Sequence, residues 1–284
     1  MIKLRPGVSE VVGNSILVTG VARSGTTMIS TLIHSCVGVE LAYEPPLLFS
    51  LFSLINTMPP AEWKLLFETY LFEDYLMNAL AGRNFNYRTY DESYTGKVKS
   101  MQEIATRLLA DGSDVEIRTK ALKARIGFKL PDILYSLREF LHHYPNVKIV
   151  VVIRNPADTI ASLLAKGWYS GQGMLPWSID NRWLDTPELQ RCESHYLQYN
   201  IFPPWCDTDK WRVLDHIILV DYDQCLINPQ ATAERIFTTL NLNPGPKTDE
   251  IIGNIEPRIG HSEGLDIPPE LNKLYQGVLE WGKI

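Results

Sequence analysis

The sequence contains little cysteine and no long apolar run. Its 284 residues include 4 scattered cysteines with no Cys-x-x-Cys pair, which argues against a disulfide framework and leaves reduced thiols as the expectation. No apolar stretch approaches the roughly 18 to 20 residues that span a bilayer, and residues 1–10 lack the apolar core of a signal peptide. No cluster of metal ligands stands out either. We therefore expect a cytoplasmic protein with no membrane partner and no metal.

Basic charge is also scarce. The 27 Lys and Arg residues face 33 Asp and Glu residues, and the net charge of −6 argues against a general affinity for nucleic acid. A local basic pocket for one small anion is compatible with that balance.

What the sequence does contain is an alternation of strand-like and helix-like segments. Short apolar runs at 15–20, 125–130, 147–153 and 216–220 alternate with amphipathic stretches. Helices are predicted at 25–36, within 46–110, at 132–142 after Pro131, and at 156–166, 187–199, 229–240 and 269–281. This order predicts an α/β fold, a P-loop-like, doubly wound parallel sheet flanked by helices, with ligands at the carboxyl ends of the strands. At 45% hydrophobic and 21% charged residues, one globular domain over 1–284 is expected.

The first strand is followed by a loop suited to phosphate. Residues 20–27 read Gly-Val-Ala-Arg-Ser-Gly-Thr-Thr and join the strand to a helix. Backbone N–H groups and the helix dipole favour an anion at such a junction. In the Walker pattern, Gly20 and Gly25 have the right separation and Thr27 the final hydroxyl position, but Thr26 occupies the lysine position and the positive charge sits at Arg23.

The missing lysine weakens a nucleoside-triphosphate interpretation. Such enzymes place that lysine on the β and γ phosphates and hold Mg²⁺ with a carboxylate, whereas the strand 147–153 ends in Arg154. A tight turn with no ligand is the other reading of the loop.

A second strand–helix junction carries a second candidate anion site. The segment 150–156 reads Val-Val-Val-Ile-Arg-Asn-Pro, in which Asn155 and Pro156 supply a helix cap and a first-turn proline, and Ser162 lies further along the helix. Arg154 at a strand end beside a helix N-terminus suits an anion. The alternative is a surface arginine with an ordinary helical serine.

Together the two motifs resemble those of sulfotransferases that use 3′-phosphoadenosine 5′-phosphosulfate (PAPS). Gly-x-x-Arg-Ser-Gly-Thr-Thr resembles the 5′-phosphosulfate loop of carbohydrate-type and bacterial members, and Arg-Asn-Pro-x-Asp-x-x-x-Ser is similar to the 3′-phosphate motif. The resemblance implies that the 5′-phosphosulfate is held by Arg23, Ser24, Gly25, Thr26 and Thr27. It also implies that Arg154 and Ser162 bind the 3′-phosphate, and that the product is adenosine 3′,5′-bisphosphate.

A third, weaker resemblance lies near the carboxyl end. Residues 258–264 read Arg-Ile-Gly-His-Ser-Glu-Gly and resemble the late loop that closes over the 3′-phosphate, although the tryptophan that often follows is missing. The resemblance implies that Arg258 and Gly260 contact the donor.

Three residues are candidates for the chemistry of sulfuryl transfer, which needs positive charge at the leaving oxygen and usually a base. Arg23 and the loop amides suit the first task. Glu44, in Tyr-Glu-Pro-Pro, resembles the Glu-Pro of carbohydrate-type members and is a candidate base; alternatively it caps the helix entered at Pro45. Lys129 resembles the lysine of the Lys-Thr-His-Leu-Pro segment in cytosolic members, but their histidine is absent here. Two roles are open for Lys129: stabilising the transferring group, or being an exposed lysine at the end of a strand.

The acceptor is expected under a lid at 167–211. This acidic segment contains Asp180, Asp185 and Glu188 and is rich in aromatic rings. The rings are Trp168, Tyr169, Trp177, Trp183, Tyr196, Tyr199, Trp205 and Trp211.

We therefore predict sulfation of a hydroxyl or of an amine or carbamoyl nitrogen in a small molecule. A natural product such as a guanidinium alkaloid toxin, or a sugar, would fit. A P-loop kinase and a non-catalytic nucleotide-binding protein are the alternatives, and ordinary packing is the alternative role for the rings.

Overall fold

The fold is built on a five-stranded, all-parallel sheet. This computed structural model describes residues 4–110, 112–167, 169, 186–200, 217–256, 262 and 264–281. The strand order is β2-β3-β1-β4-β5. The strands are β1 (Ile16–Gly20), β2 (Val39–Tyr43), β3 (Arg125–Lys129), β4 (Lys148–Ile153) and β5 (Ile217–Asp221). The predicted P-loop-like α/β class is confirmed.

Helices surround this sheet. In chain order the helices are α1 (Val8–Gly13), α2 (Thr26–His34), α3 (Pro46–Ser53), α4 (Pro60–Glu68), η1 (Thr69–Leu76), α5 (Met77–Leu80), α6 (Thr95–Val98), α7 (Met101–Leu109), α8 (Asp114–Ala121), η2 (Leu134–Ser136), α9 (Leu137–His143), α10 (Pro156–Lys166), α11 (Glu188–Asn200), α12 (Tyr222–Ile227), α13 (Pro229–Leu240), α14 (Thr248–Gly253) and α15 (Pro269–Trp281). Among the described residues, no helix is long and apolar enough to cross a membrane.

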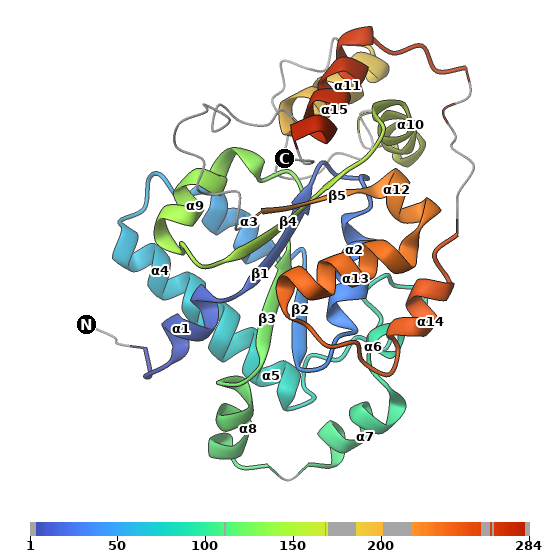
Figure 1. Cartoon of the computed structure of the whole chain (residues 1–284). Coiled ribbons are helices and arrows are strands. Elements are labelled where there is room, and N and C mark those ends of the chain that lie inside the picture. The colour runs from blue at the N-terminus through green and yellow to red at the C-terminus, as the bar shows by residue number, and fades with distance from the viewer. Residues whose placement is uncertain are drawn as a thin grey trace.

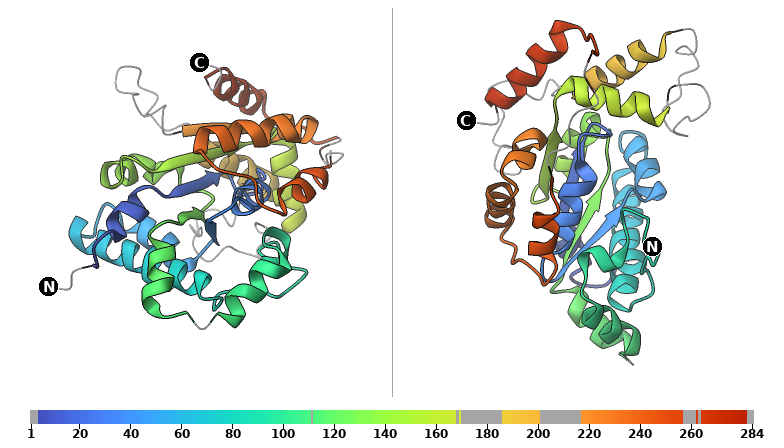
Figure 2. Two further views of the ribbon diagram at one scale, coloured as in Figure 1. Left: turned by 60° about the horizontal axis from the view of Figure 1, so that its bottom comes forward. Right: turned by 90° about the vertical axis from the view of Figure 1, so that its right-hand side faces the viewer.

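Two helical layers cover the faces of the sheet (Figure 2). Helices α2, α12, α13 and α14 pack on one face, where Val18 and Val152 point, and α1, α3, α4, η1 and α9 pack on the other, where Leu17 and Val151 point. The alternation follows from the period of two in a strand, which sends neighbouring side chains to opposite faces. The neighbouring strands β1 and β4 therefore contain consecutive apolar residues, at 16–18 and 149–153, and these runs could be recognised in the sequence.

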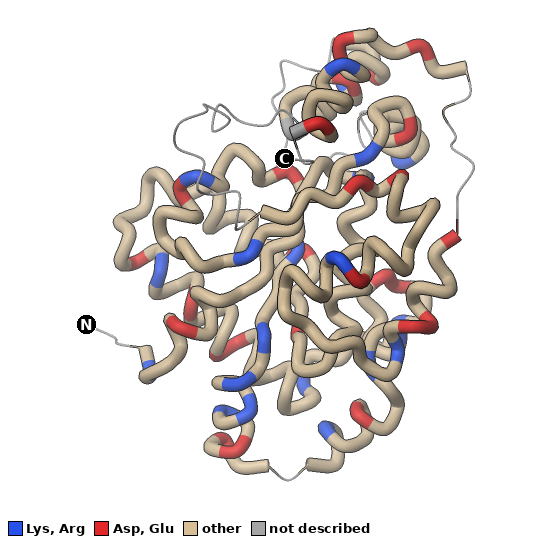
Figure 3. The backbone as a smooth tube through the Cα atoms, in the orientation of Figure 1, with Lys and Arg blue, Asp and Glu red and all other residues tan. Residues whose placement is uncertain are grey.

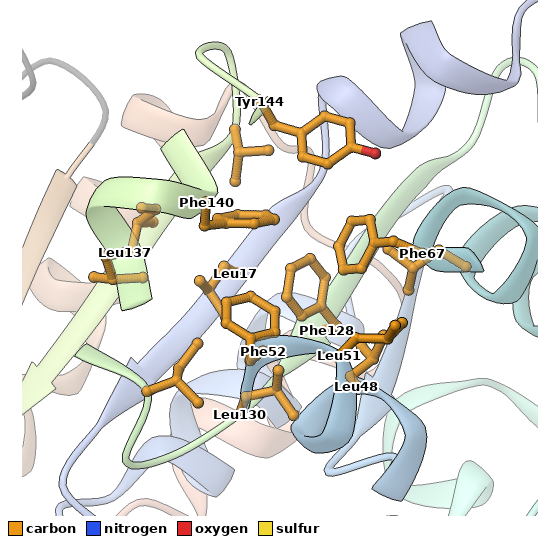
Figure 4. Close-up of a cluster of buried hydrophobic side chains, with 14 of the residues drawn as sticks. Leu17, Leu48, Leu51, Phe52, Phe67, Phe128, Leu130, Leu137, Phe140 and Tyr144 are labelled. Carbon is orange, nitrogen blue, oxygen red and sulfur yellow. The ribbon is translucent and has the colours of Figure 1, made fainter. Parts of the chain in front are cut away.

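Aromatic rings fill the second of these faces (Figure 4). The ring centroids of Phe52 and Phe140 lie 5.0 Å apart, and Trp63 stacks on Phe67 at 4.8 Å. The indole N–H of Trp63 donates to the carbonyl of Leu51 at 2.6 Å, so the buried ring keeps its hydrogen bond. Leu17 of β1 and Phe128 of β3 belong to this core, and the carboxyl ends of both strands lead to the candidate site.

A third apolar cluster lies at one end of the sheet. Helices α10, α11 and α15 lie together there, above the carboxyl ends of the strands (Figure 1). Their side chains pack on Val21 and Ala22, which directly follow β1. The loop of residues 20–25 is thus covered on its apolar side by helices.

The short helices α1, α8, α12 and α14 were not predicted, and two further differences lie close to the candidate site. Strand β2 was not predicted, because its second residue, Glu40, interrupts the apolar pattern and yet is only 3% exposed. The helix predicted for 132–142 does not begin at Asp132: this residue has a φ of 62°, and the chain becomes helical at η2 and α9. Pro131 is followed by a turn and not by a helical start.

Charged residues of both signs are mixed over the described chain. Figure 3 shows Lys and Arg positions interspersed with Asp and Glu positions. Lys129 at the carboxyl end of β3 and Arg154 directly after β4 belong to the candidate site.

Candidate active site

The loop between β1 and α2 is wound tightly. Three of its residues have positive φ: Gly20 at 148°, Arg23 at 71° and Gly25 at 97°. A methyl group on Gly20 would lie 2.2 Å from the carbonyl oxygen of Val152, and one on Gly25 would lie 2.0 Å from the ring of Tyr222. Both glycines are therefore required by close contacts as well as by backbone conformation.

Asp132 holds the start of this loop. Its backbone N–H donates to the carbonyl of Gly20 at 2.9 Å, and its carboxylate accepts from the backbone N–H of Ala22 at 2.8 Å. The positive φ of Asp132 makes both bonds possible at once, which explains why the predicted helix does not start here. Sequence reasoning missed this residue because its partners lie 110 positions away.

The second junction has the predicted cap. The side chain of Asn155 accepts from the N–H groups of Ala157 at 2.9 Å and Asp158 at 3.4 Å, and Pro156 opens α10. The backbone N–H of Asn155 donates to the carboxylate of Asp223 at 2.8 Å, which ties the start of α10 to the first turn of α12. The predicted cap and proline are confirmed.

The two predicted anion sites are joined by their own side chains. Nε of Arg23 donates to Oγ of Ser162 at 3.1 Å, and a terminal nitrogen of Arg154 donates to the carbonyl of Arg23 at 3.3 Å. The guanidinium of Arg154 also lies 5.0 Å from the ring centre of Tyr222, a cation–π contact. Arg23, Arg154 and Ser162 thus form one assembly between β1 and β4, and Arg154 is not a free surface arginine.

Some buried polar groups in this assembly lack a hydrogen bond within the described part of the chain. They are Nε of Arg154 and the hydroxyl of Ser24, which is 1% exposed. An unpaired buried donor is unfavourable unless a ligand meets it. Together with the loop glycines, these groups fit a bound anion.

Lys129 and Glu44 meet beside the loop. Nζ of Lys129 lies 2.5 Å from Oε1 of Glu44 and donates to Oγ1 of Thr27 at 2.6 Å. Lys129 is 4% exposed, so the alternative of an exposed strand-end lysine is wrong. Helix α3 has Pro45 at its cap position and no side-chain cap, so the capping alternative for Glu44 is wrong as well.

Comparison with known proteins identifies the class. A profile of the Sulfotransferase family matches residues 15–244, which is most of the chain. The chain belongs to the sulfotransferase family. It is therefore an enzyme of the sulfotransferase class. No curated protein sequence matches it.

Solved structures share the fold of this sulfotransferase. The sulfotransferase domain of the Synechococcus PCC 7002 olefin synthase has a TM-score of 0.54 at 13% identity, over 93% of this chain and 94% of that one. The sulfotransferase domain from the curacin biosynthetic pathway has a TM-score of 0.52 at 14% identity, over 93% and 89%. Sulfotransferase STF9 from Mycobacterium avium has a TM-score of 0.51 at 14% identity, over 95% and 78%. At these identities the likeness shows the fold alone.

Several predicted residues of the sulfotransferase lie outside the described part of the chain. Arg258 and Gly260 are among them, as are Asp180 and Asp185 of the expected lid. So are the rings of Trp168, Trp177, Trp183, Trp205 and Trp211. Tyr169 and Tyr196 are described, and Tyr196 is fully buried.

The structure adds residues around the site that sequence reasoning passed over. The hydroxyl of Tyr275, on α15, lies 3.0 Å from Oδ2 of Asp223 and 3.2 Å from Oδ1 of Asp221. Burial raises the pKa of Asp223, and its hydrogen bonds to Asn155 and Tyr275 oppose the shift. No local pattern signals these contacts, because they join residues more than 50 positions apart.

Proposed function

We propose that this sulfotransferase moves the sulfuryl group of PAPS to a small-molecule acceptor and releases adenosine 3′,5′-bisphosphate. The assembly of Arg23, Arg154 and Ser162 supports the proposal best, because it brings the two predicted anion sites together. A donor with a 5′-phosphosulfate and a 3′-phosphate carries two anionic groups and suits such a pair of sites.

The donor would be held at both strand–helix junctions. Ser24, Thr26 and Thr27 at the start of α2 offer hydroxyl and amide donors to the 5′ group. Arg154 at the start of α10 would hold the 3′ group with Ser162. Arg23, which already contacts Ser162, would lie between the two groups. The unpaired Ser24 hydroxyl and Arg154 Nε agree with that fit. When bound, PAPS supplies the sulfuryl group for transfer.

Lys129 and Glu44 are proposed for the chemistry. The ammonium of Lys129 touches the hydroxyl of Thr27 in the loop, where it would stabilise negative charge that develops on the leaving oxygen. The Glu44 side chain is 43% exposed and is a candidate to take the acceptor proton. Its ion pair with Lys129 keeps both groups in place beside the donor loop.

The acceptor is proposed to be a hydroxyl or nitrogen of a natural product, such as a guanidinium alkaloid, or of a sugar. The half-exposed carboxylate of Glu44 is compatible with a cationic or neutral acceptor.

Ligand binding followed by turnover tests the proposal. Adenosine 3′,5′-bisphosphate is expected to raise the melting temperature more than ATP with Mg²⁺ does, and sulfate transfer from PAPS is expected with a member of an acceptor panel. Phosphoryl transfer from ATP without transfer from PAPS would mean a kinase. Stabilisation by the bisphosphate with no acceptor sulfated would mean a nucleotide-binding protein without this activity.

Arg154→Ala tests the 3′ site directly. We expect it to weaken the bisphosphate by tenfold or more, about 1.4 kcal/mol, because a charge-assisted contact is lost. Arg138→Ala is the matched control, since Arg138 is an exposed arginine on α9. Calorimetric titration measures both variants, and equal affinity in Arg154→Ala and wild type would remove the 3′-phosphate assignment.

A further inference from the structure

Helix α11 rests directly on the donor loop. Its residues Cys192 and Tyr196 share an apolar cluster with Val21 and Ala22, and Tyr196 is fully buried. Figure 1 shows α11 beside α10 and α15 at the carboxyl end of the sheet. The helix therefore covers the apolar side of the loop, formed by Val21 and Ala22.

One polar connection runs from α11 to the carbonyl of Arg23. The hydroxyl of Tyr196 donates to the backbone carbonyl of Arg154 at 3.0 Å. The side chain of Arg154 in turn donates to the carbonyl of Arg23 at 3.3 Å. Tyr196 thus fixes the backbone of Arg154. The side chain of Arg154 in turn holds Arg23, which has a left-handed conformation.

A second connection runs from the neighbouring residue to Ala22. Nε2 of His195 lies 3.2 Å from Oδ1 of Asp132, within ion-pair range although not aligned as a hydrogen bond. The same carboxylate oxygen accepts from the N–H of Ala22 at 2.8 Å. On its other side His195 contacts the hydroxyl of Tyr169 through Nδ1, and the histidine is only 5% exposed.

From these two connections we infer that α11 is a brace for the donor loop. Tyr196 and His195 are positioning residues: they act through Arg154 and Asp132 and set the affinity of the loop for the bisphosphate nucleotide. The inference deepens the proposed function and rests on it for the identity of the nucleotide. That the loop is braced does not depend on the ligand.

The conformation of the loop explains why a brace matters. Arg23 has a φ of 71°, a region that residues other than glycine adopt only when their surroundings impose it. Donor amides that already point at a shared site bind an anion without a further loss of backbone freedom. Loosening the contacts at Ala22 and Arg23 would return that freedom to the loop and weaken binding.

Two measurements on the full chain test the brace. The first is hydrogen exchange of peptides that cover residues 20–26 in the protein without nucleotide. The second is the dissociation constant of adenosine 3′,5′-bisphosphate by calorimetry. The variants are Tyr196→Phe, which removes one hydroxyl and keeps the ring, His195→Leu and His195→Gln. Gln198→Ala, at an exposed position of the same helix, is the control.

The expected result is faster exchange of the loop amides in Tyr196→Phe and His195→Leu. The affinity should be about threefold to tenfold weaker, through loss of one hydrogen bond in Tyr196→Phe and of one polar contact to Asp132 in His195→Leu. His195→Gln, which keeps a donor near Nε2, is expected to restore most of the affinity lost in His195→Leu, and Gln198→Ala is expected to match wild type. In turnover assays KM for PAPS should rise while KM for the acceptor stays the same.

Other results would show whether the brace or the proposed donor is wrong. Loop exchange at the wild-type rate in both Tyr196→Phe and His195→Leu overturns the brace, whatever the nucleotide. A wild-type protein that does not bind the bisphosphate overturns the proposed donor, while the exchange data still decide whether α11 holds the loop. Loss of kcat in His195→Gln at unchanged nucleotide affinity would assign His195 to proton transfer and overturn its positioning role.

Discussion

The two ends of strand β2 carry glutamates in opposite surroundings. Glu40, near the amino end, is 3% exposed and lies 2.6 Å from Arg107, 3.3 Å from Lys99 and 3.6 Å from His34. Glu44 directly follows the carboxyl end, is 43% exposed as a side chain and contacts Lys129. Glu40 is buried among several partners, whereas part of the Glu44 side chain is exposed to solvent.

This contrast separates a charge enclosed by its partners from a charge that we propose for the reaction. Burial alone would raise the pKa of Glu40, but Lys99, His34 and Arg107 hold it well below the usual range of a carboxyl group. Lys99 has a further partner in the carbonyl of Val39 at 2.6 Å. A charge surrounded in this way contributes to the folded state and has no side free for a ligand. The Glu44 side chain is 43% exposed, which agrees with its proposed role beside an acceptor.

The largest effect on stability is expected from Glu40→Gln. The change leaves Lys99 and Arg107 buried with less negative charge near them, and breaking a buried ion pair costs about 3–5 kcal/mol. Urea denaturation measures the loss. Glu92→Gln is the matched control, because the pair of Glu92 with Lys97 is exposed and is worth less than about 1 kcal/mol. Equal stability of the two variants would show that the Glu40 cluster is not structural.

A large effect on catalysis is expected from Lys129→Met. Loss of the positive charge beside Thr27 should lower kcat by about 10²- to 10³-fold, as for removal of one group that stabilises the transition state. Affinity for the bisphosphate should change by less than about threefold, since the proposal places Lys129 at the transferring group. Single-turnover assays and calorimetry together check this, and a fall in affinity with intact kcat would move Lys129 to the donor-holding set.

Glu44→Gln should cost less stability than Glu40→Gln but should lower activity strongly. Lys129 is buried, whereas the Glu44 side chain is 43% exposed. The loss of stability should therefore lie between less than about 1 kcal/mol for an exposed pair and about 3–5 kcal/mol for a buried one, while loss of a general base lowers kcat by about 10²-fold or more. The measurements are urea denaturation and initial rates with saturating PAPS. Unchanged kcat would mean that another group takes the acceptor proton.

The smallest expected effect is the loss of folding stability at acidic pH. Burial lowers the pKa of His34, and the Glu40 pKa is also lowered, so in both cases the unfolded chain binds more protons than the folded chain as the pH falls. The stabilisation is complete above the ordinary pKa of each group and is lost on acidification. The contribution of His34 declines below about pH 6.5 and that of Glu40 below about pH 4.5, each by at most about 1.4 kcal/mol per pH unit.

Urea titrations from about pH 7.5 to about pH 4 measure this dependence. The slope between about pH 6.5 and pH 5 should flatten in His34→Gln, and the slope at lower pH should flatten in Glu40→Gln. Parallel curves for wild type and both variants would contradict the assignment.

The features that could be predicted from the sequence are local ones. The loop after β1 and the Arg154 junction are local: glycines, a short apolar strand and a capped helix lie within a few positions of one another. They follow from backbone rules that act over one turn or one strand. The chemistry of Glu44 and Lys129 came from the family resemblance, and the structure adds that the two side chains touch.

The features that escaped prediction depend on distant partners. Strand β2 contains Glu40, whose charge partners Arg107 and Lys99 lie far away in the sequence, Arg107 by 67 positions. Asp132 was assigned to a helix because Pro131 precedes it, whereas its conformation is set by the loop after β1. Tyr196 was one ring among many in the sequence, and only the fold places its hydroxyl on Arg154. A single sequence contains no signal for such pairings.

The contact between Gly25 and Tyr222 has a practical consequence for protein engineering. Because any side chain at residue 25 would overlap the ring of Tyr222, libraries that vary the loop to change donor preference should leave this position fixed. Conversely, Gly25→Ala alone is expected to disrupt the loop, because the added methyl group overlaps the ring of Tyr222. Combining Gly25→Ala with Tyr222→Leu, which removes the ring, would show whether the ring or the left-handed backbone is what forbids a side chain at residue 25.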